Sequence, residues 1–400
     1  MSAVVVSGLG VVSPHGDDTQ GMFDAVLRGE SAVRPVFPDL ARPAAAATVA
    51  FDEGRWFSKL QLPGVDRVSQ LAVAAAQLAV QDAGGLNDAD RERVGIYAGC
   101  GMGGAAALEA AYRSGGRVPP LTIPAFMPNA PAGHVALRLG VLGPVITYSV
   151  ACASSAVAIA EAAKALRNGE IDIAIAGGSE ALIVPGVMLA WQAMMTLAGF
   201  APGEAARACR PFASDRSGFA LGEGAAFLVL ETAARARARG ARVYAQLAGW
   251  GLSCDATHLT KPDANGQQRA LRGALRQAGL QPADVAYCNA HGTATKIGDA
   301  VEAEALRGVW GTAIDDLRVS STKALHGHLL GGAGALEAVI TVLAVHRRQL
   351  PPNAHCDSPD AALGLNLVLQ AGAEAPQLQA AISSSFAFGG TNSTLVFTRA

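Results

Sequence analysis

Charged residues, aromatic residues and closely spaced cysteines are all scarce in this chain of 400 residues. Only 16% of the residues are charged and 5% are aromatic, and the formal net charge is −2. Because there is no basic excess, the composition does not indicate a nucleic-acid-binding protein. The six cysteines include no C-x-x-C pair, and more than thirty residues separate each from the next. This spacing argues against a zinc site and a disulfide scaffold, and it favours reduced thiols in a cytoplasmic protein.

Targeting and membrane-spanning segments are also lacking. Residues 1–12 are apolar but have no opening Lys or Arg, and they lead into a turn with Gly8, Gly10 and Pro14. Such a beginning is typical of a buried strand and its turn, and it is unlike a signal peptide. No apolar run approaches the roughly 20 residues that a membrane-spanning helix needs. We therefore expect a soluble protein without membrane contact.

Half of the residues are hydrophobic and 46 are glycine, which is enough to bury a large core. Short β-branched runs alternate with Ala-rich stretches, and this alternation favours an α/β fold with mostly parallel strands. The predicted strands are Val4–Val6, Val94–Ala98, Val145–Ser149, Ile171–Ala176, Ala226–Leu230, Val285–Asn289 and Arg318–Ser321. The predicted helices are Ser69–Ala83, Cys152–Asn168, Gln267–Ala278, Val301–Arg307 and Gly331–Arg347. A closing antiparallel hairpin is predicted over Ala380–Ser384 and Thr394–Thr398.

Two segments, residues 145–169 and 318–348, share one layout. Each has a strand, an elbow with reactive side chains, and a helix of small residues that ends in basic residues. A duplicated α/β half with its join near residues 239–242 explains this likeness, although two segments alone leave the duplication open. No Pro/Ser-rich linker separates the halves, so we expect one compact body.

Cys152 lies where a predicted strand ends and a helix begins. Lys164 and Arg167 in the last turn, followed by Asn168 and Gly169, mark the end of that helix. A thiol at a helix N-terminus faces free backbone N–H groups and the positive end of the helix dipole, and both favour the nucleophilic thiolate. The alternative is a buried structural cysteine, which is the usual fate of a free thiol.

Two histidines lie in polar segments that follow predicted strands. His291 comes directly after Val285–Asn289, a common place for catalytic residues in α/β proteins, although a loop histidine that caps the next helix is the alternative. His328 follows Lys323 among apolar residues and glycines, which is unlike a solvated face. Glu337 on the next helix can pair with Lys323 if the helix folds back. A neutral histidine beside a cation suits stabilisation of negative charge on a carbonyl oxygen.

The glycine-rich tail segment Ser384–Asn392 supplies flexible backbone N–H groups between two predicted strands. It is a candidate half of an oxyanion hole, with the N–H group of Cys152 as the other half. An ordinary glycine hairpin is the alternative.

Other chemistries each account for one motif only. Gly99–Gly104 matches the G-x-G-x-x-G dinucleotide fingerprint, but it is not near the first strand, and the required acidic residue is missing. His291, His326 and His328 have neither H-E-x-x-H spacing nor an acidic partner, so no metal is expected. The G-x-S-x-G motif of serine hydrolases is absent. A Cys–His–His site, by contrast, uses three motifs together.

These motifs together resemble those of the β-ketoacyl-acyl carrier protein synthases, of the elongating type in the thiolase superfamily, and the resemblance runs nearly end to end. The segments that carry it are Val5–Pro14, Ala151–Ser155, Pro211-Phe212 with Gly222–Gly224, His291–Thr295, Thr322-Lys323 with Gly327-His328, and Phe388–Asn392. The resemblance implies a five-layered αβαβα body of two duplicated halves, residues 1–240 and 241–400. It also implies a homodimer, or a heterodimer with a related ketosynthase-like subunit.

The resemblance further implies a ketosynthase in fatty-acid or related polyketide elongation. Cys152 then accepts an acyl chain from acyl carrier protein, and malonyl-acyl carrier protein loses CO₂ and attacks that thioester. No cofactor is implied, because the substrates arrive on the phosphopantetheine of the carrier protein. By this analogy His291 and His328 bind the malonyl thioester oxygen, and Lys323 paired with Glu337 sets the electrostatics of the site.

The remaining site residues are also assigned by the resemblance. The backbone N–H groups of Cys152 and Phe388 form the oxyanion hole. Phe388 is a gating residue with Phe219 as its neighbour across the site. Met102 lines the far end of the acyl pocket, where it is expected to limit chain length. Thr293 and Thr295 bind substrate.

Two departures from the family pattern concern the pathway. Lys296 stands where fatty-acid synthases of this type usually have Pro, as in ketosynthases of type II polyketide and aryl-polyene pathways, and Ala387 replaces a more usual Gly. A specialised polyketide or polyene ketosynthase is therefore the alternative within enzymes. A noncatalytic chain-length partner is the alternative of another class, but such subunits characteristically lack the nucleophile that Cys152 supplies.

Overall fold

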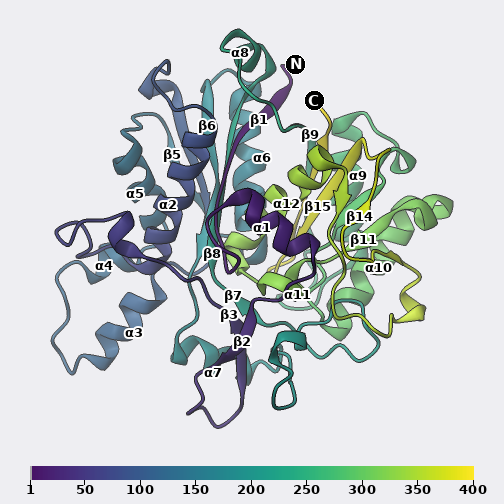
Figure 1. Cartoon of the computed structure of the whole chain (residues 1–400), viewed down its shortest axis with the longest axis horizontal. Helices are drawn as coiled ribbons and strands as arrows, with labels where there is room; N and C mark the ends of the chain where they lie inside the picture. The colour runs from purple at the N-terminus through teal and green to yellow at the C-terminus, as the bar shows by residue number, and fades with distance from the viewer. Residues whose placement is uncertain (1) are drawn as a thin grey trace.

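The computed structural model describes residues 2–400, and its backbone is built around one mixed sheet of eleven strands (Figure 1). In spatial order the strands are β13 (Asn366–Leu367), β11 (Arg318–Ser320), β10 (Tyr287–Asn289), β15 (Ala380–Phe386), β16 (Thr391–Thr398), β9 (Ala245–Cys254), β1 (Val4–Val12), β8 (Gly224–Thr232), β6 (Ile173–Glu180), β4 (Val94–Gly99) and β5 (Val145–Tyr148). The smaller strands are β2 (Val33–Val36), β3 (Ala44–Ala47), β7 (Leu221–Gly222), β12 (Gln349–Leu350) and β14 (Ala373–Glu374).

The strand order repeats, and this repetition confirms the duplicated halves. In the first half the order is β5-β4-β6-β8-β1, and in the second it is β11-β10-β15-β16-β9. In each half the first three strands of this order pair in parallel, and the two pairings that follow are antiparallel. The halves meet where Val4–Val6 pairs with Ala245–Leu247, a join of three residues on each side.

Helices form three layers around the two half-sheets (Figure 1). The main helices are α2 (Arg67–Asp82), α5 (Ala130–Leu139), α6 (Ser154–Arg167), α9 (Ala264–Ala278), α10 (Lys296–Trp310) and α12 (Ala333–Arg347). Helices α6 and α12 contact each other in the middle layer, where they pack between the two half-sheets, while α2 and α9 cover the outer faces. This arrangement is the predicted αβαβα fold.

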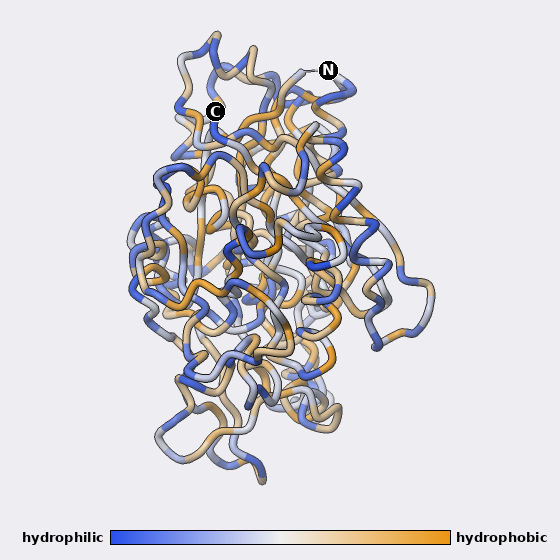
Figure 2. Tube along the Cα trace, turned by 90° about the vertical axis from the view of Figure 1, so that its right-hand side faces the viewer, coloured by the Kyte–Doolittle hydropathy of each residue, from blue (hydrophilic) through white to orange (hydrophobic). Residues whose placement is uncertain are grey.

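The other helices are short and lie mostly around the rim. They are α1 (Thr19–Leu27), α3 (Ala105–Arg113), α4 (Thr122–Phe126), α7 (Pro185–Ala193), α8 (Ala233–Ala238) and α11 (Lys323–His326). In Figure 2 many of the hydrophilic segments lie along the outline of the molecule, as expected when the apolar faces of the elements are turned toward the layers between them.

Helix α12 is buried almost everywhere, and it corrects one expectation. The segment Leu330–Arg347 has a mean hydropathy of 1.3 and is long and apolar enough to cross a membrane by length and composition. The expectation that no apolar run approaches that length was therefore wrong. The helix is apolar on all sides because it lies in the middle layer, where 89% of the segment is buried.

The first strand of each half packs on its helix through a glycine. A Cβ atom on Gly10 of β1 would lie 2.2 Å from the carbonyl oxygen of Ala75 in α2. A Cβ atom on Gly251 of β9 would lie 1.9 Å from the carbonyl oxygen of Ala270 in α9. Only glycine permits this approach, so the same device recurs in both halves.

The predicted core elements are confirmed, with differences at their ends. The predicted helix Val301–Arg307 is the middle of the longer helix α10, which begins where the side chain of Thr295 accepts a hydrogen bond from the Gly298 N–H group (3.1 Å). Helix α6 begins at Ser154 rather than Cys152, because a 3-10 turn over Ala151–Ala153 precedes it.

Candidate active site

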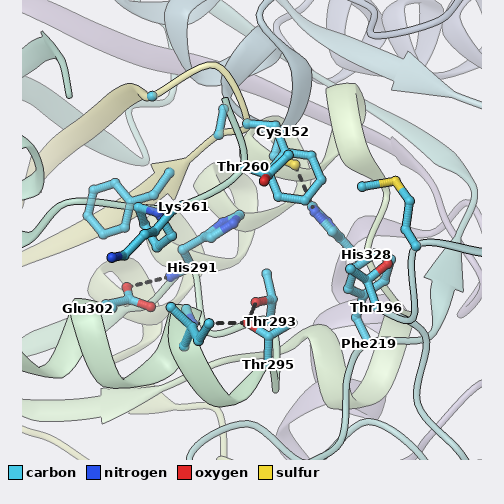
Figure 3. Close-up of a pocket in the computed structure, with 18 of the residues that line it drawn as sticks. Cys152, Thr196, Phe219, Thr260, Lys261, His291, Thr293, Thr295, Glu302 and His328 are labelled. Carbon is cyan, nitrogen blue, oxygen red and sulfur yellow. Dashed lines mark hydrogen bonds between the residues drawn. The ribbon is translucent and has the colours of Figure 1, made fainter. Parts of the chain in front are cut away.

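A cavity of about 720 Å³ opens between the two halves and has Cys152 in its wall. The first half contributes Cys152 and Phe219, and the second contributes His291, His328 and Phe388. Figure 3 shows the side chains of Cys152, His291 and His328 converging from separate segments of the chain. The predicted Cys–His–His site is therefore assembled in one place.

The turn that carries Cys152 is tightly held. Ala151 has a positive φ of 48°, a strained conformation for a residue with a Cβ atom. The hydroxyl of Ser154 donates to the carbonyl oxygen of Ala151 (2.7 Å) and accepts from the N–H group of Val150 (2.9 Å). These bonds close the elbow between β5 and α6 and turn the thiol toward the cavity.

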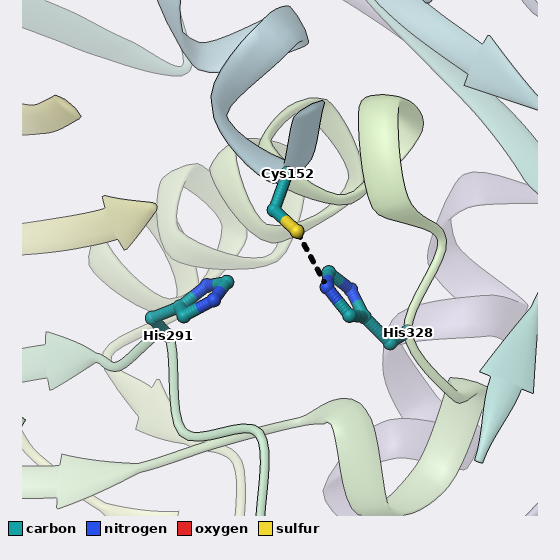
Figure 4. A group of neighbouring side chains, drawn as sticks. All are labelled: Cys152, His291 and His328. Atoms are coloured by element: carbon teal, nitrogen blue, oxygen red, sulfur yellow. Dashed lines mark hydrogen bonds between the residues drawn. The ribbon is translucent and has the colours of Figure 1, made fainter. Parts of the chain in front are cut away.

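The two ring nitrogens of His328 have different partners, and these indicate which nitrogen carries the proton. Its Nε2 atom lies 3.1 Å from Cys152 Sγ, a contact drawn as a dashed line in Figure 4, and the N–H group of Leu330 donates to its Nδ1 atom (3.3 Å). Burial first, and then the charge of Lys323, hold the pKa of His328 well below its usual value. A neutral ring that accepts at Nδ1 carries its proton on Nε2, so His328 donates toward Cys152.

His291 lies on the other side of the sulfur. Its ring centroid is 5.5 Å from that of His328, and the two rings are nearly perpendicular. The carboxylate of Glu302 accepts from the N–H groups of His291 (2.8 Å) and Gly292 (2.7 Å), which anchors the loop after β10 to α10. Burial and Lys323 also keep the pKa of His291 well below normal, so both rings are neutral.

Lys323 and Glu337 form a fully buried ion pair, which confirms the predicted pairing. Burial raises the pKa of Glu337 to about 7, against the opposing effect of the Lys323 charge. Burial of a charged pair is costly, but Glu337 holds the Lys323 cation inside the protein, where its charge helps to lower the pKa values of both histidines. Neither of the two lines the cavity itself.

The protonation state of Cys152 differs from the expected thiolate. Burial raises its pKa to about 12, although the charge of Lys323 and the N–H group of Phe388 act to lower it. The expected thiolate is thus disfavoured, because the desolvation of the sulfur outweighs both favourable effects.

Aromatic side chains form one wall of the cavity. Phe388 stacks on Trp191 with ring centroids 6.2 Å apart, and Phe219 meets Trp191 edge to face at 5.5 Å. Phe219 also contacts His328 at 5.3 Å. Since Phe388 stands before Gly389 and Gly390, both with positive φ, its ring is carried by a bend in the chain.

The remaining predicted residues divide into two groups. Thr293 and Thr295 line the cavity, with their hydroxyl oxygens 3.1 Å apart, and Lys296 and Ala387 also line it. Met102 does not line this cavity of the single chain, and its side chain is 46% exposed.

Sequence reasoning missed Glu302 and Trp191. Asp299 and Glu302 are both buried on the inner face of α10, where burial raises each pKa to about 7. Two acidic residues three positions apart in an otherwise apolar helical face are a signal that could have found Glu302. No comparable pattern marks Trp191, which reaches the cavity only through α7.

Two alternative chemistries, a metal site and a dinucleotide site, can be compared with the geometry. Cys152, His291 and His328 offer three ligand atoms within 4.8 Å of one another. A metal at His328 Nε2 would need the ring proton on Nδ1, and that would break the hydrogen bond from the Leu330 N–H group. In the Gly99–Gly104 segment, the N–H groups of Gly101 and Met102 are already bonded to the carboxylate of Glu180, so they are not free for a phosphate.

The repeated half-sheets, the middle helix pair and a central cysteine with two neutral histidines define a thiolase-like condensing enzyme. The models of the beta-ketoacyl synthase N-terminal and C-terminal domains match residues 1–236 and 244–357. The chain belongs to the β-ketoacyl synthase family and is a ketosynthase, an acyltransferase of fatty-acid or polyketide elongation.

Relatives support this assignment over nearly the whole chain. The 3-oxoacyl-[acyl-carrier-protein] synthase 2 of Staphylococcus aureus (strain N315) is 36% identical over 413 residues, covering 98% of this chain and 97% of its own length. Nodulation protein E of Rhizobium sp. (strain N33) is 38% identical over 404 residues, covering 98% of each chain.

Solved structures agree with the fold. A beta-ketoacyl synthase from Burkholderia phymatum STM815 has a TM-score of 0.92 at 33% identity, with all of both chains covered. The ishigamide ketosynthase/chain length factor has a TM-score of 0.92 at 31% identity, covering 100% of this chain and 99% of that one. A type II polyketide ketosynthase in complex with its acyl-carrier protein has a TM-score of 0.91 at 28% identity, with both chains fully covered.

Proposed function

We propose that the chain performs decarboxylative Claisen condensation with Cys152 as the nucleophile and with His291 and His328 as the groups that stabilise the enolate. The observation that carries the proposal is the His328 Nε2 proton facing Cys152 Sγ at 3.1 Å, with neutral His291 beside it.

In the first step, Cys152 Sγ attacks the carbonyl carbon of an acyl thioester on a carrier protein. The new bond joins that carbon to Sγ, the bond to the pantetheine sulfur breaks, and the released pantetheine thiol takes the proton that Cys152 loses. The N–H groups of Cys152 and Phe388 stabilise the oxyanion of the tetrahedral intermediate. Because the thiol has a pKa of about 12, loss of its proton accompanies the attack rather than preceding it.

In the second step, a malonyl thioester occupies the emptied cavity. Its bond to the carboxylate breaks, CO₂ leaves, and the electron pair forms an enolate whose oxygen accepts hydrogen bonds from His291 and His328. The enolate carbon then attacks the acyl carbon on Cys152, and the bond from that carbon to Sγ breaks. The Cys152 thiolate that leaves takes one proton from solvent water, so the enzyme returns to its starting state. Burial, reinforced by the charge of Lys323, keeps both histidines neutral, so each can donate a hydrogen bond to the enolate oxygen.

Both substrates are proposed to arrive on an acyl carrier protein, with no resident cofactor or metal. The hydroxyls of Thr293 and Thr295 line the cavity and suit the amides of a phosphopantetheine arm. The structural relative in complex with its acyl-carrier protein supports this partner. A carrier-protein enzyme of this kind works in the cytoplasm.

We propose a dimer, either of this chain or with a related subunit, formed along the edge strand β5. Val145 and Ile146 of this strand are 41% and 39% exposed, and an apolar edge strand is a ready surface for pairing. Met102, also exposed, would be covered by the same interface and there line the acyl pocket. Within each chain we place the boundary between the halves at residues 240 and 241.

The specialised pathway remains a second candidate because Lys296 and Ala387 lie in the cavity wall itself. A lysine at the cavity mouth and a stiffer loop before Phe388 change the environment of the substrate and leave the reacting centre unaltered.

The test is acylation followed by intact-mass measurement with a panel of acyl-carrier proteins. Wild-type protein should gain one acyl group at Cys152, and Cys152→Ala should gain none and lose condensation by at least about a thousandfold. Cys254→Ala, which removes an exposed thiol, is the matched control and should behave as wild type. Failure of the wild type to take up any acyl chain would favour the noncatalytic chain-length partner.

A further inference from the structure

Glu180, the last residue of β6, is a fully buried carboxylate behind the wall of the active-site cavity. Its Oε2 atom accepts from the N–H groups of Gly101 (2.8 Å) and Gly331 (3.0 Å), and its Oε1 atom accepts from the N–H group of Met102 (3.2 Å). These three donors are backbone groups, and the thiol of Cys100 also contacts Oε1 (3.8 Å). The Glu180 side chain therefore joins three separate segments of the chain: the end of β6, the loop after β4 and the turn before α12.

The backbone around Glu180 is shaped to admit a carboxylate. A Cβ atom on Gly101 would lie 2.6 Å from Oε2, and a Cβ atom on Gly331 would also lie 2.6 Å from it. Neither position tolerates a side chain while the carboxylate stays in place. Burial raises the pKa of Glu180 to about 7, and the three backbone hydrogen bonds offset part of that desolvation.

The turn that is bonded to Glu180 also determines which ring nitrogen of His328 carries the proton. Leu330, which precedes Gly331, has a φ of 45°, a left-handed conformation that is unfavourable for leucine. The N–H group of this residue donates to His328 Nδ1, and its side chain lines the cavity. A strained residue persists only when its surroundings hold it, and the bond from the next N–H group to Glu180 is such a restraint.

We propose that Glu180 is a positioning residue for decarboxylation. Its carboxylate holds the Gly331 N–H group, keeps Leu330 in its left-handed turn, and so fixes the His328 tautomer that donates from Nε2. This inference rests on the proposed role of His328 in stabilising the enolate.

The first test is Glu180→Gln, which preserves size but replaces one acceptor oxygen with an NH₂ group that faces the backbone donors. Decarboxylation of malonyl-carrier protein should fall by about tenfold or more, while acyl transfer to Cys152 stays within about twofold. The matched control is Glu231→Gln. Glu231 is also fully buried, at the opposite end of the neighbouring strand β8, and pairs with Arg239. That control should leave the ratio of the two half-reactions unchanged.

A second variant keeps the carboxylate and displaces it. In Gly101→Ala the new Cβ atom would displace Oε2, and the same selective fall in decarboxylation is expected. Gly133→Ala, where a Cβ atom meets nothing within 4 Å, is its control. In ¹⁵N-histidine spectra, both test variants should show a smaller fraction of the His328 tautomer that is protonated on Nε2.

An equal fall in both half-reactions, an unchanged ratio, or loss of folding in both variants would overturn the proposal and leave Glu180 as a structural carboxylate. His328→Ala separates this result from failure of the proposed function. If that variant retains full decarboxylation, the role of His328 itself is wrong; if it loses decarboxylation while Glu180→Gln does not, only the role of Glu180 is wrong.

Discussion

At the scale of single residues, the active site combines burial with neutral hydrogen-bond donors. Cys152, His291 and His328 are all buried, and burial is the first cause of each pKa change. Desolvation raises the pKa of the thiol and lowers those of the imidazoles, because in every case it disfavours the charged form. The result is an uncharged reaction centre, and the buried cation Lys323 lies near it without lining the cavity.

The raised pKa of Cys152 predicts how its reactivity varies with pH. Because the thiolate is the reactive form and the pKa is about 12, the fraction of thiolate grows about tenfold for each pH unit up to that value. The rate of iodoacetamide labelling at Cys152, followed by peptide mass spectrometry, should therefore rise without a plateau between pH 6 and pH 10. A plateau near neutral pH would show that the helix dipole outweighs burial after all.

The buried pair of Lys323 and Glu337 predicts a large effect of removing one partner. Lys323→Met leaves Glu337 buried without its cation and should lower the free energy of unfolding by about 3 kcal/mol. The double variant Lys323→Met/Glu337→Leu should regain most of that loss in urea denaturation. A double variant that loses as much as the two single variants added together would indicate that the pair has no energetic coupling.

At the scale of elements, small residues determine how closely strands and helices approach. The first strand of each half meets its outer helix through glycine, while α6 and α12 meet in the middle layer. The alternation of apolar runs predicted these elements well, because each has a core face and a regular period. It did not predict the ends of α10 or α6, since those depend on a cap by Thr295 and on the 3-10 turn at Cys152.

Gly251→Ala tests the strand–helix contact in the second half. The added Cβ atom would fall 1.9 Å from a backbone oxygen of α9, so β9 and α9 must separate, and stability should fall by about 3 kcal/mol. Thermal denaturation measures this loss. Gly133→Ala in the open part of α5 is the control and should be neutral or stabilise the protein by about 0.5–1 kcal/mol. Equal melting temperatures for wild type and Gly251→Ala would contradict the close packing.

At the scale of the whole molecule, the site exists only because two halves meet. The nucleophile comes from the first half, and both histidines, Lys323 and the glycine loop come from the second. The repeated strand order places the turn after β5 opposite the turn after β11, so that α6 and α12 begin near the same point. Duplication therefore explains the location of the site as well as the fold.

The exposed edge strand β5 predicts how assembly responds to charge. Ile146→Lys places a cation on the proposed interface and should weaken the dimer by about tenfold or more. Light scattering over a range of concentrations measures the change. Leu60→Lys, at a side chain that is 93% exposed elsewhere, is the control. A dimer unchanged by Ile146→Lys would place the interface on another face.

The α/β class, most core elements and the three residues of the Cys–His–His site could be predicted from the sequence, and the Lys323–Glu337 pairing could be predicted only on the condition that the helix folds back. These follow from local periodicity and from motifs whose spacing survives in the linear chain. The protonation of Cys152, the His328 tautomer and the positioning role of Glu180 could be inferred only from the folded structure. Each depends on burial or on contacts between segments far apart in sequence, such as Gly101 and Gly331 at one carboxylate, and no local pattern encodes either.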